Sequence, residues 1–84
     1  MSELQEKDVN HNSLQFSYNA LRGRIIEVCG RNKVFADKMG MSEASLSSKL
    51  SGKAGFSQED IFKACQILDI PDNQINHYFF TLAV

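Results

Sequence analysis

The 84-residue chain is long enough for one small domain and too short for a second. Hydrophobic residues make up 43% of it, so we expect a folded core and not a chain that is disordered throughout. No stretch approaches the ~18 consecutive apolar residues of a membrane span, and the polar N-terminus lacks the apolar run of a signal peptide. We therefore expect a cytoplasmic protein that has no membrane partner.

The net charge of −1 conceals an uneven distribution along the chain. Residues 22–53 carry seven Lys or Arg side chains against three acidic ones, whereas residues 54–84 carry one lysine against four acidic side chains. A local basic surface is typical of a phosphate-facing protein, although a solvated charged face gives the same pattern. Charge alone leaves nucleic-acid binding open.

The first 15 residues show little apolar periodicity, which predicts a disordered, flexible tail at 1–15 and a domain at 16–84. A first helix is predicted to begin after Ser17, which suits an N-cap, and to end at Gly30. Within it, apolar residues recur at helical spacing, namely Tyr18, Leu21, Ile25 and Val28.

A short second helix over 32–39 is predicted to end at Gly40, a position that favours positive φ. Ser42 then caps a third helix, in which the only apolar pair is Leu46 and Leu50. The other faces of this helix carry small polar side chains. The third helix is therefore predicted to bury one narrow stripe and to expose the rest.

The fourth helix begins with a capping-box pattern, Ser57 followed by Asp60. Its buried stripe is predicted to be Ile61, Ala64, Cys65 and Leu68. Pro71 then opens a last short helix that runs through about Tyr78, with Ile75 and Phe79 predicted to point inward. Only the ending alternates with period two, as a strand would, at Phe80, Leu82 and Val84. The sequence therefore predicts an all-α fold of five short helices.

The segment that carries function joins the second and third helices. Two helices can cross steeply over a tight turn only where the first presents a small side chain, as Ala36 does. Gly40 tolerates the positive φ of the turn, and Leu46 anchors the second helix of the pair. This scaffold predicts a helix-turn-helix whose polar face is free to enter a DNA major groove.

The stretch ADKMGM at 36–41 resembles the same stretch in lambda-type phage repressors, and residues 31–52 are similar to the helix-turn-helix of the repressor and Cro family. The stretches 18–26 and 78–80 resemble small phage-type regulators of Gram-positive bacteria. The resemblance implies a five-helix, lambda-repressor-like DNA-binding domain that works in the cytoplasm of a bacterial host. It further implies binding to double-stranded operator DNA, usually as a symmetric homodimer.

Carried over position by position, the resemblance assigns base reading in the major groove to three residues, Glu43, Ala44 and Ser48. It places residues that hold the DNA backbone at Asn32, Ser47, Ser51 and Lys53. Two arginines of the first helix add further phosphate contacts, Arg22 and Arg24.

The C-terminal end of the chain is densely apolar. It predicts either core side chains or a dimer surface, and we favour the surface, made by Tyr78, Phe79, Phe80, Leu82 and Val84. The two cysteines, Cys29 and Cys65, are predicted to be small core residues. No histidine, cysteine or serine has a partner at metal-binding or catalytic spacing. We therefore expect no metal, no cofactor and no enzymatic activity.

Two functions remain open at this point. The first is a Cro-like or repressor-like regulator that binds operator DNA and controls a phage genetic switch. The second is an antirepressor or modulator that keeps the fold but binds a partner phage repressor and masks its DNA-binding surface. The chemically poor third helix and the acidic Glu43 favour the second, since an acidic helix edge can occupy a basic surface that reads DNA.

Overall fold

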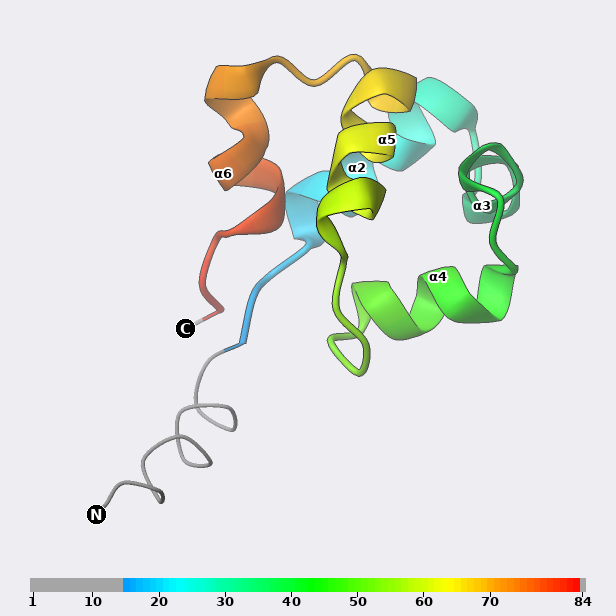
Figure 1. Cartoon of the computed structure of the whole chain (residues 1–84), viewed down its shortest axis with the longest axis horizontal. Helices are drawn as coiled ribbons and strands as arrows, with labels where there is room; N and C mark the ends of the chain where they lie inside the picture. Colours follow the sequence, from blue (N-terminus) through cyan, green and yellow to red (C-terminus); the bar gives the residue numbers. More distant parts are fainter. Residues whose placement is uncertain (1–14, 84) are drawn as a thin grey trace.

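A computed structural model describes residues 15–83 of the chain, and within them the fold is all-α (Figure 1). The elements follow one another as α2 (Asn19–Cys29), α3 (Asn32–Met39), α4 (Glu43–Leu50), α5 (Gln58–Leu68), the 3₁₀ turn η1 (Asp72–Gln74) and α6 (Ile75–Phe79). The five α-helices of this part of the chain confirm the predicted fold class. The tail predicted at 1–15 lies, apart from its last residue, outside the described residues. Within residues 15–83, no helix has the length and apolar character to cross a membrane.

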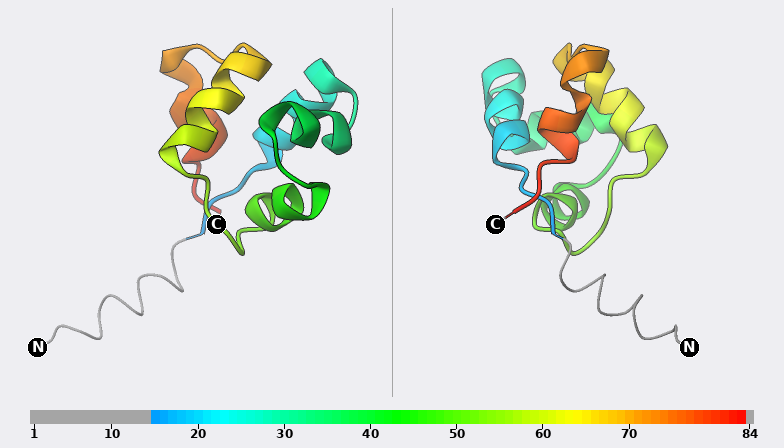
Figure 2. Two further views of the ribbon diagram at one scale, coloured as in Figure 1. Left: turned by 45° about the vertical axis from the view of Figure 1, so that its right-hand side comes forward. Right: turned by 90° about the vertical axis from the view of Figure 1, so that its left-hand side faces the viewer.

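The first helix begins one residue later than predicted. Its N-cap is Tyr18 and not Ser17, because the backbone N–H of Ser17 donates to the carbonyl of Thr81 at 2.7 Å. This bond belongs to a short antiparallel contact between Phe16 and Leu82, which brings the two ends of the domain side by side (Figure 2). The chain therefore stays extended through Ser17 before it turns into α2.

The starts of α4 and α5 follow the predicted caps. The hydroxyl of Ser42 accepts a 3.0 Å hydrogen bond from the backbone N–H of Ser45 at the start of α4. At the start of α5, the Ser57 hydroxyl accepts from the Asp60 N–H, and the Asp60 carboxylate accepts from the Ser57 N–H, each at 3.0 Å. This reciprocal capping box satisfies two backbone donors that a helix N-terminus would otherwise leave unpaired.

The C-terminal segment departs from its prediction in two ways. Pro71 precedes a 3₁₀ turn, Asp72–Gln74, so the last α-helix begins only at Ile75. Within residues 15–83, the alternating residues at the end form one isolated β-bridge, between Leu82 and Phe16, and do not extend into a strand. The Phe80 ring packs edge-on against Phe16 at a centroid distance of 5.8 Å, which adds a side-chain contact to this pairing.

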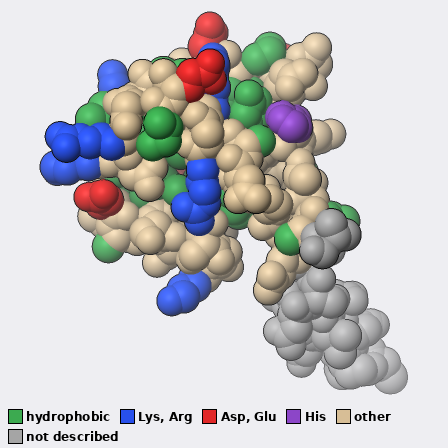
Figure 3. All heavy atoms as spheres, turned by 180° about the vertical axis from the view of Figure 1, so that it is seen from behind, with side chains coloured by type: hydrophobic (Ala, Val, Ile, Leu, Met, Phe, Trp, Pro, Cys, Tyr) green, Lys and Arg blue, Asp and Glu red, His purple; other side chains and the backbone are tan. Residues whose placement is uncertain are grey.

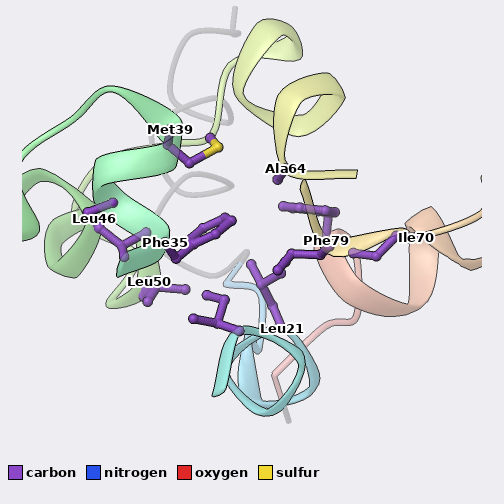
Figure 4. Packing of buried hydrophobic residues seen from close by; sticks show 11 residues of the cluster. Leu21, Phe35, Met39, Leu46, Leu50, Ala64, Ile70 and Phe79 are labelled. Carbon is purple, nitrogen blue, oxygen red and sulfur yellow. The ribbon is translucent and has the colours of Figure 1, made fainter. Parts of the chain in front are cut away.

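The hydrophobic core receives side chains from all five described α-helices. Phe35 of α3 lies fully buried at its centre, with Leu46 and Leu50 of α4 on one side and Leu21 of α2 and Phe79 of α6 on the other (Figure 4). Every buried residue of the described chain is apolar. Burial of side chains of this size stabilises a fold by roughly 1.5–3 kcal/mol each. Leu46 and Leu50 thereby fix α4 to the body of the domain.

Candidate macromolecule-binding surface on α4

The turn between α3 and α4 sets the direction of α4. In Figure 1, α3 is seen nearly end-on while α4 lies across the view, so the two helices cross steeply. Ala36 is 1% exposed at this junction, and Gly40 has a left-handed backbone with φ 76°. The N–H of Met41 donates to the Ala36 carbonyl at 3.0 Å, and the N–H of Gly40 donates to the Asp37 carbonyl at 3.1 Å. The turn therefore satisfies two of the last four carbonyls of α3, those of Ala36 and Asp37.

The outer face of α4 is polar and accessible. Glu43, Ala44 and Ser47 are exposed, whereas Ser48 is half-buried. Leu46 and Leu50 are the two buried side chains of α4. A helix with one buried stripe and an open polar face can contact a macromolecule without unfolding any part of the domain. The three residues predicted to read bases thus lie on one helix beside the open face, and their role in reading DNA stays a prediction.

Both arginines predicted to contact phosphate point back to the protein. Arg22 donates from Nη2 to the Leu50 carbonyl at 3.1 Å, which caps the C-terminal end of α4 from α2. Arg24 donates from Nε to the Leu68 carbonyl at 2.9 Å and pairs with Glu27 at 3.2 Å. A guanidinium near a helix C-terminus is favoured there by the unpaired carbonyls and the helix dipole. These two cations therefore link helices of the fold.

Two lysines, Lys49 and Lys63, also connect separate elements of the fold. Lys63 donates to the Met39 carbonyl at 3.2 Å, at the C-terminal end of α3. Lys49 pairs with the Asp60 carboxylate at 3.0 Å and donates to the Gly55 carbonyl at 3.0 Å, and both side chains of the pair are 19% exposed. The Lys49–Asp60 pair thus closes the loop between α4 and α5. Sequence reasoning missed it, because the partners belong to different elements.

The electrostatics of Asp60 reflect this loop closure. Burial raises the pKa of the Asp60 carboxyl, but hydrogen bonds from the Ser57 backbone and from Lys49, together with the positive charge of Lys49, lower it further than burial raises it. The net result is a pKa below the usual value for aspartate. Contacts that form only in the folded chain therefore stabilise the charged form of the Asp60 carboxylate.

Three cations have no hydrogen bond or ion pair with another residue in the range 15–83, namely Arg31, Lys38 and Lys53. Of the residues predicted to contact phosphate, Lys53 is exposed and Asn32 is half-buried. Ser51 donates its hydroxyl to the Ser48 carbonyl at 3.1 Å. From behind, Lys and Arg side chains are scattered over this side of the molecule, with acidic side chains among them (Figure 3). This face carries no continuous basic stripe.

The predicted dimer surface divides between surface and core. Phe79 is 2% exposed, so it belongs to the core and contributes no surface, because α6 packs this side chain inward. Phe80 and Leu82 are exposed, and Tyr78 is half-buried against the core. Val84 lies outside the described residues. Dimerisation through this ending stays a prediction.

An aromatic hollow of about 440 Å³ opens beside the C-terminal end of α4, and sequence reasoning did not anticipate it. Its rings come from three separate segments of the chain, with Phe56 in contact with Tyr18 at a centroid distance of 5.2 Å and with Phe79 at 5.4 Å. Burial raises the pKa of the Tyr18 hydroxyl. The loop residues Gly52 and Gly55 line the other side. No periodic pattern could reveal it, since its parts meet only in the folded chain.

The described residues contain no group of three or more His, Cys, Asp or Glu side chains that could hold a metal ion. Cys29 and Cys65 are unpaired thiols, each half-buried and packed against the core. Polar side chains near α4 therefore serve caps, links between helices and the exposed surface.

Comparison with known proteins places the chain in a family. The family described as a protein of unknown function (DUF739) matches residues 14–82, and the chain belongs to it. Among solved structures, the chain is similar to the solution structure of the modulator of repression (MOR) of the temperate bacteriophage TP901-1 from Lactococcus lactis. The two chains are 38% identical with a TM-score of 0.70, over 79% of this chain and 89% of that one. Comparison with curated proteins finds no match. Membership of the lambda repressor and Cro family stays a prediction.

Proposed function

We propose that this chain is a phage regulatory protein that modulates repression through a protein partner. In this proposal it binds a phage repressor and covers the surface with which that repressor contacts DNA. The observation that carries the proposal is the 38% identity, over 79% of this chain, to a protein whose name is modulator of repression. The proposed role is regulatory and has no enzymatic step, and we place it in the cytoplasm of a bacterial host, where the repressor would be.

The use of the basic side chains supports a protein partner over DNA. Affinity for DNA rests largely on cations that neutralise phosphates. Here the guanidinium groups of Arg22 and Arg24 donate to the carbonyls at the ends of α4 and α5, and Lys49 is paired with Asp60. Redirecting any of these cations to a phosphate would leave a helix end or a carboxylate without its partner. Arg22 and Lys49, the two cations that contact α4 or belong to it, are thus poorly available for the DNA backbone.

The acidic edge of α4 supports the same proposal. Glu43 is exposed in the first turn of α4 and has no ion pair within residues 15–83. A carboxylate at this place is repelled by phosphates but is attracted to the basic surface of a DNA-binding protein. The small side chains of Ala44 and Ser47 beside it allow a partner to approach the helix closely. We therefore propose the exposed face of α4 as the surface that meets the repressor.

Direct binding to operator DNA, as a homodimer, is the second candidate. It is favoured by the open polar face of α4 and by the exposed Lys53 immediately after it. In that case a dimer would set two copies of α4 about one DNA turn (~34 Å) apart. Binding would weaken steeply with salt, and Lys53→Ala would weaken binding to every sequence alike.

A mobility-shift titration separates the two candidates. The purified protein is mixed with the DNA upstream of its own gene, with and without the repressor encoded beside it, over a range of salt concentrations. We expect no shift by this protein alone, and a loss or change of the shift caused by the repressor. If this protein shifted the DNA on its own and Lys53→Ala weakened that shift, the result would instead support the second candidate.

A further inference from the structure

A second surface lies on the part of the domain formed by α5, η1 and α6, and no residue of α4 contributes to it. It is a groove of about 450 Å³. Its apolar lining consists of Ile61, Phe62, Cys65, Ile70 and Ile75. Because these residues come from α5, from the link after it and from the first turn of α6, the groove has walls that the fold fixes on both sides. It is distinct from the aromatic hollow beside α4, with which it shares only Ile61.

Phe62 stands at this groove as the most exposed large apolar side chain of residues 15–83, with 64% of its surface accessible. It occupies the outer side of α5, whose inner side is fixed to the core by Ala64 and Leu68. An exposed phenylalanine contributes nothing to the core and favours aggregation, so its place beside an apolar groove is typical of a binding surface. Aromatic residues at such positions are the common anchors of protein interfaces.

The only charged side chain that lines the groove is acidic. Asp72 lines it, and two amide side chains, Gln58 and Gln66, supply its other polar groups. Asp72 lies close enough to Cys65 that its negative charge adds to burial in raising the pKa of that thiol. Lys63, the lysine of α5, donates to the Met39 carbonyl on another side of the domain, and Arg24 of α2 donates to the Leu68 carbonyl. No cation lines the groove.

We propose that this groove is a docking site for an amphipathic helix of another protein, one that places an apolar ridge against Phe62 and a Lys or Arg side chain against Asp72. The groove provides an apolar floor, hydrogen-bonding amides at its sides and an unpaired carboxylate, which complement such a helix. A second copy of this chain fits it less well, because no cation lines the groove, so a symmetric groove-to-groove pairing would offer Asp72 no opposite charge. This surface is independent of the role proposed for α4.

The test uses two synthetic helical peptides and the whole chain. Both peptides carry leucines at positions i, i+3, i+4 and i+7, and the residues beside this stripe are lysines in one peptide and glutamates in the other. Each is titrated into ¹⁵N-labelled protein, and the backbone amide signals are followed by NMR. We expect the lysine peptide to shift the signals of Phe62, Gln66 and Ile75, and the glutamate peptide to bind at least about tenfold more weakly.

Two variants localise the binding. Phe62→Ala should weaken the lysine peptide about tenfold or more, because truncation of an interface anchor removes most of its contribution. Ile26→Ala, which truncates an exposed apolar residue of α2 outside the groove, should leave the affinity unchanged. Since both side chains are exposed, both variants should keep the wild-type circular dichroism and thermal midpoint.

Four results would overturn the proposal. They are no binding by either peptide, equal binding of both peptides, shifts confined to α4 or to the aromatic hollow, and concentration-dependent shifts of the groove signals in the free protein. The last result would assign the groove to a second copy of the chain. None of them bears on the proposed role of α4, since neither peptide contains the repressor surface and Glu43 lies outside the groove.

Discussion

The side chain of Arg22 in α2 donates a hydrogen bond to the backbone carbonyl of Leu50, the last residue of α4, at 3.1 Å. Two other helices of the described chain end in the same way, with Arg24 on the carbonyl of Leu68 and Lys63 on that of Met39. In each pair the cation belongs to a different helix from the carbonyl. Side chains that look like a phosphate-binding set in the sequence therefore also connect the helices to one another.

Arg22→Met should destabilise the fold by about 1 kcal/mol, because it removes the charged donor from the end of α4 but keeps an apolar stem. Arg22→Lys should lose less, since an ammonium can still reach a carbonyl. Urea unfolding followed by circular dichroism measures both variants. If Arg22→Met kept full stability while the protein bound DNA less tightly, Arg22 would be a phosphate ligand and not a helix cap.

Two glycine substitutions should act in opposite directions. Gly23 lies inside α2 with open space where a Cβ would go, so Gly23→Ala should stabilise the protein by roughly 0.5–1 kcal/mol through helix propensity. Gly40 has φ 76°, a backbone that alanine adopts only with strain, so Gly40→Ala should destabilise by about 1 kcal/mol. Thermal unfolding of the pair is the measurement. A neutral Gly40→Ala would mean that the turn before α4 relaxes freely.

Leu46 and Ser47 are neighbours on α4 with opposite environments. Leu46 is fully buried, so Leu46→Ala should cost roughly 2–5 kcal/mol, enough to unfold much of a domain of this size. Ser47 is exposed, and Ser47→Ala should change stability by less than about 0.5 kcal/mol. Guanidinium unfolding compares the two. Equal effects would show that α4 is not anchored by its apolar stripe.

The stability of the fold should depend on pH through the ionisation of Asp60. Because its pKa in the folded chain lies below the usual 3.8, the charged carboxylate stabilises the fold at neutral pH, and this stabilisation is lost as pH falls below that value. Asp60→Asn should be less stable than the parent at pH 7 and should show a flatter decline towards low pH. Lys49→Met should flatten the decline in the same way, since it removes the partner ammonium. Thermal midpoints measured from pH 7 to pH 2 test this, and parallel curves for all three proteins would contradict it.

Helix boundaries that are marked by residues only a few positions apart could be predicted closely from the sequence. Gly40 and the Ser57–Asp60 box gave correct ends because a left-handed turn and a reciprocal cap depend on residues at fixed short spacing. The start of α2 was misplaced by one residue because Ser17 pairs with Thr81, a partner at the far end of the domain. Phe79 was predicted to point inward in the last helix, as it does, and was wrong only as a member of the dimer surface, because a dense apolar ending does not show which of its side chains enter the core.

The candidate site was predictable in part. The exposed face of α4 followed from its single apolar pair, whereas the direction of each cation did not. Arg22 and Arg24 lie 28 and 44 residues from the carbonyls that they contact, and no local pattern encodes such a pairing. The number of Lys and Arg side chains in residues 22–53 therefore overstated how many cations are free to contact a phosphate.

The most direct test of the proposed function is charge reversal at Glu43. If α4 meets a basic surface of a repressor, Glu43→Lys should weaken repressor binding about tenfold or more in isothermal titration calorimetry. Glu27→Lys reverses an exposed carboxylate on α2 and should leave that affinity nearly unchanged. If α4 instead reads DNA, Glu43→Lys should strengthen binding to operator DNA and leave the repressor unaffected. That second outcome would contradict the account.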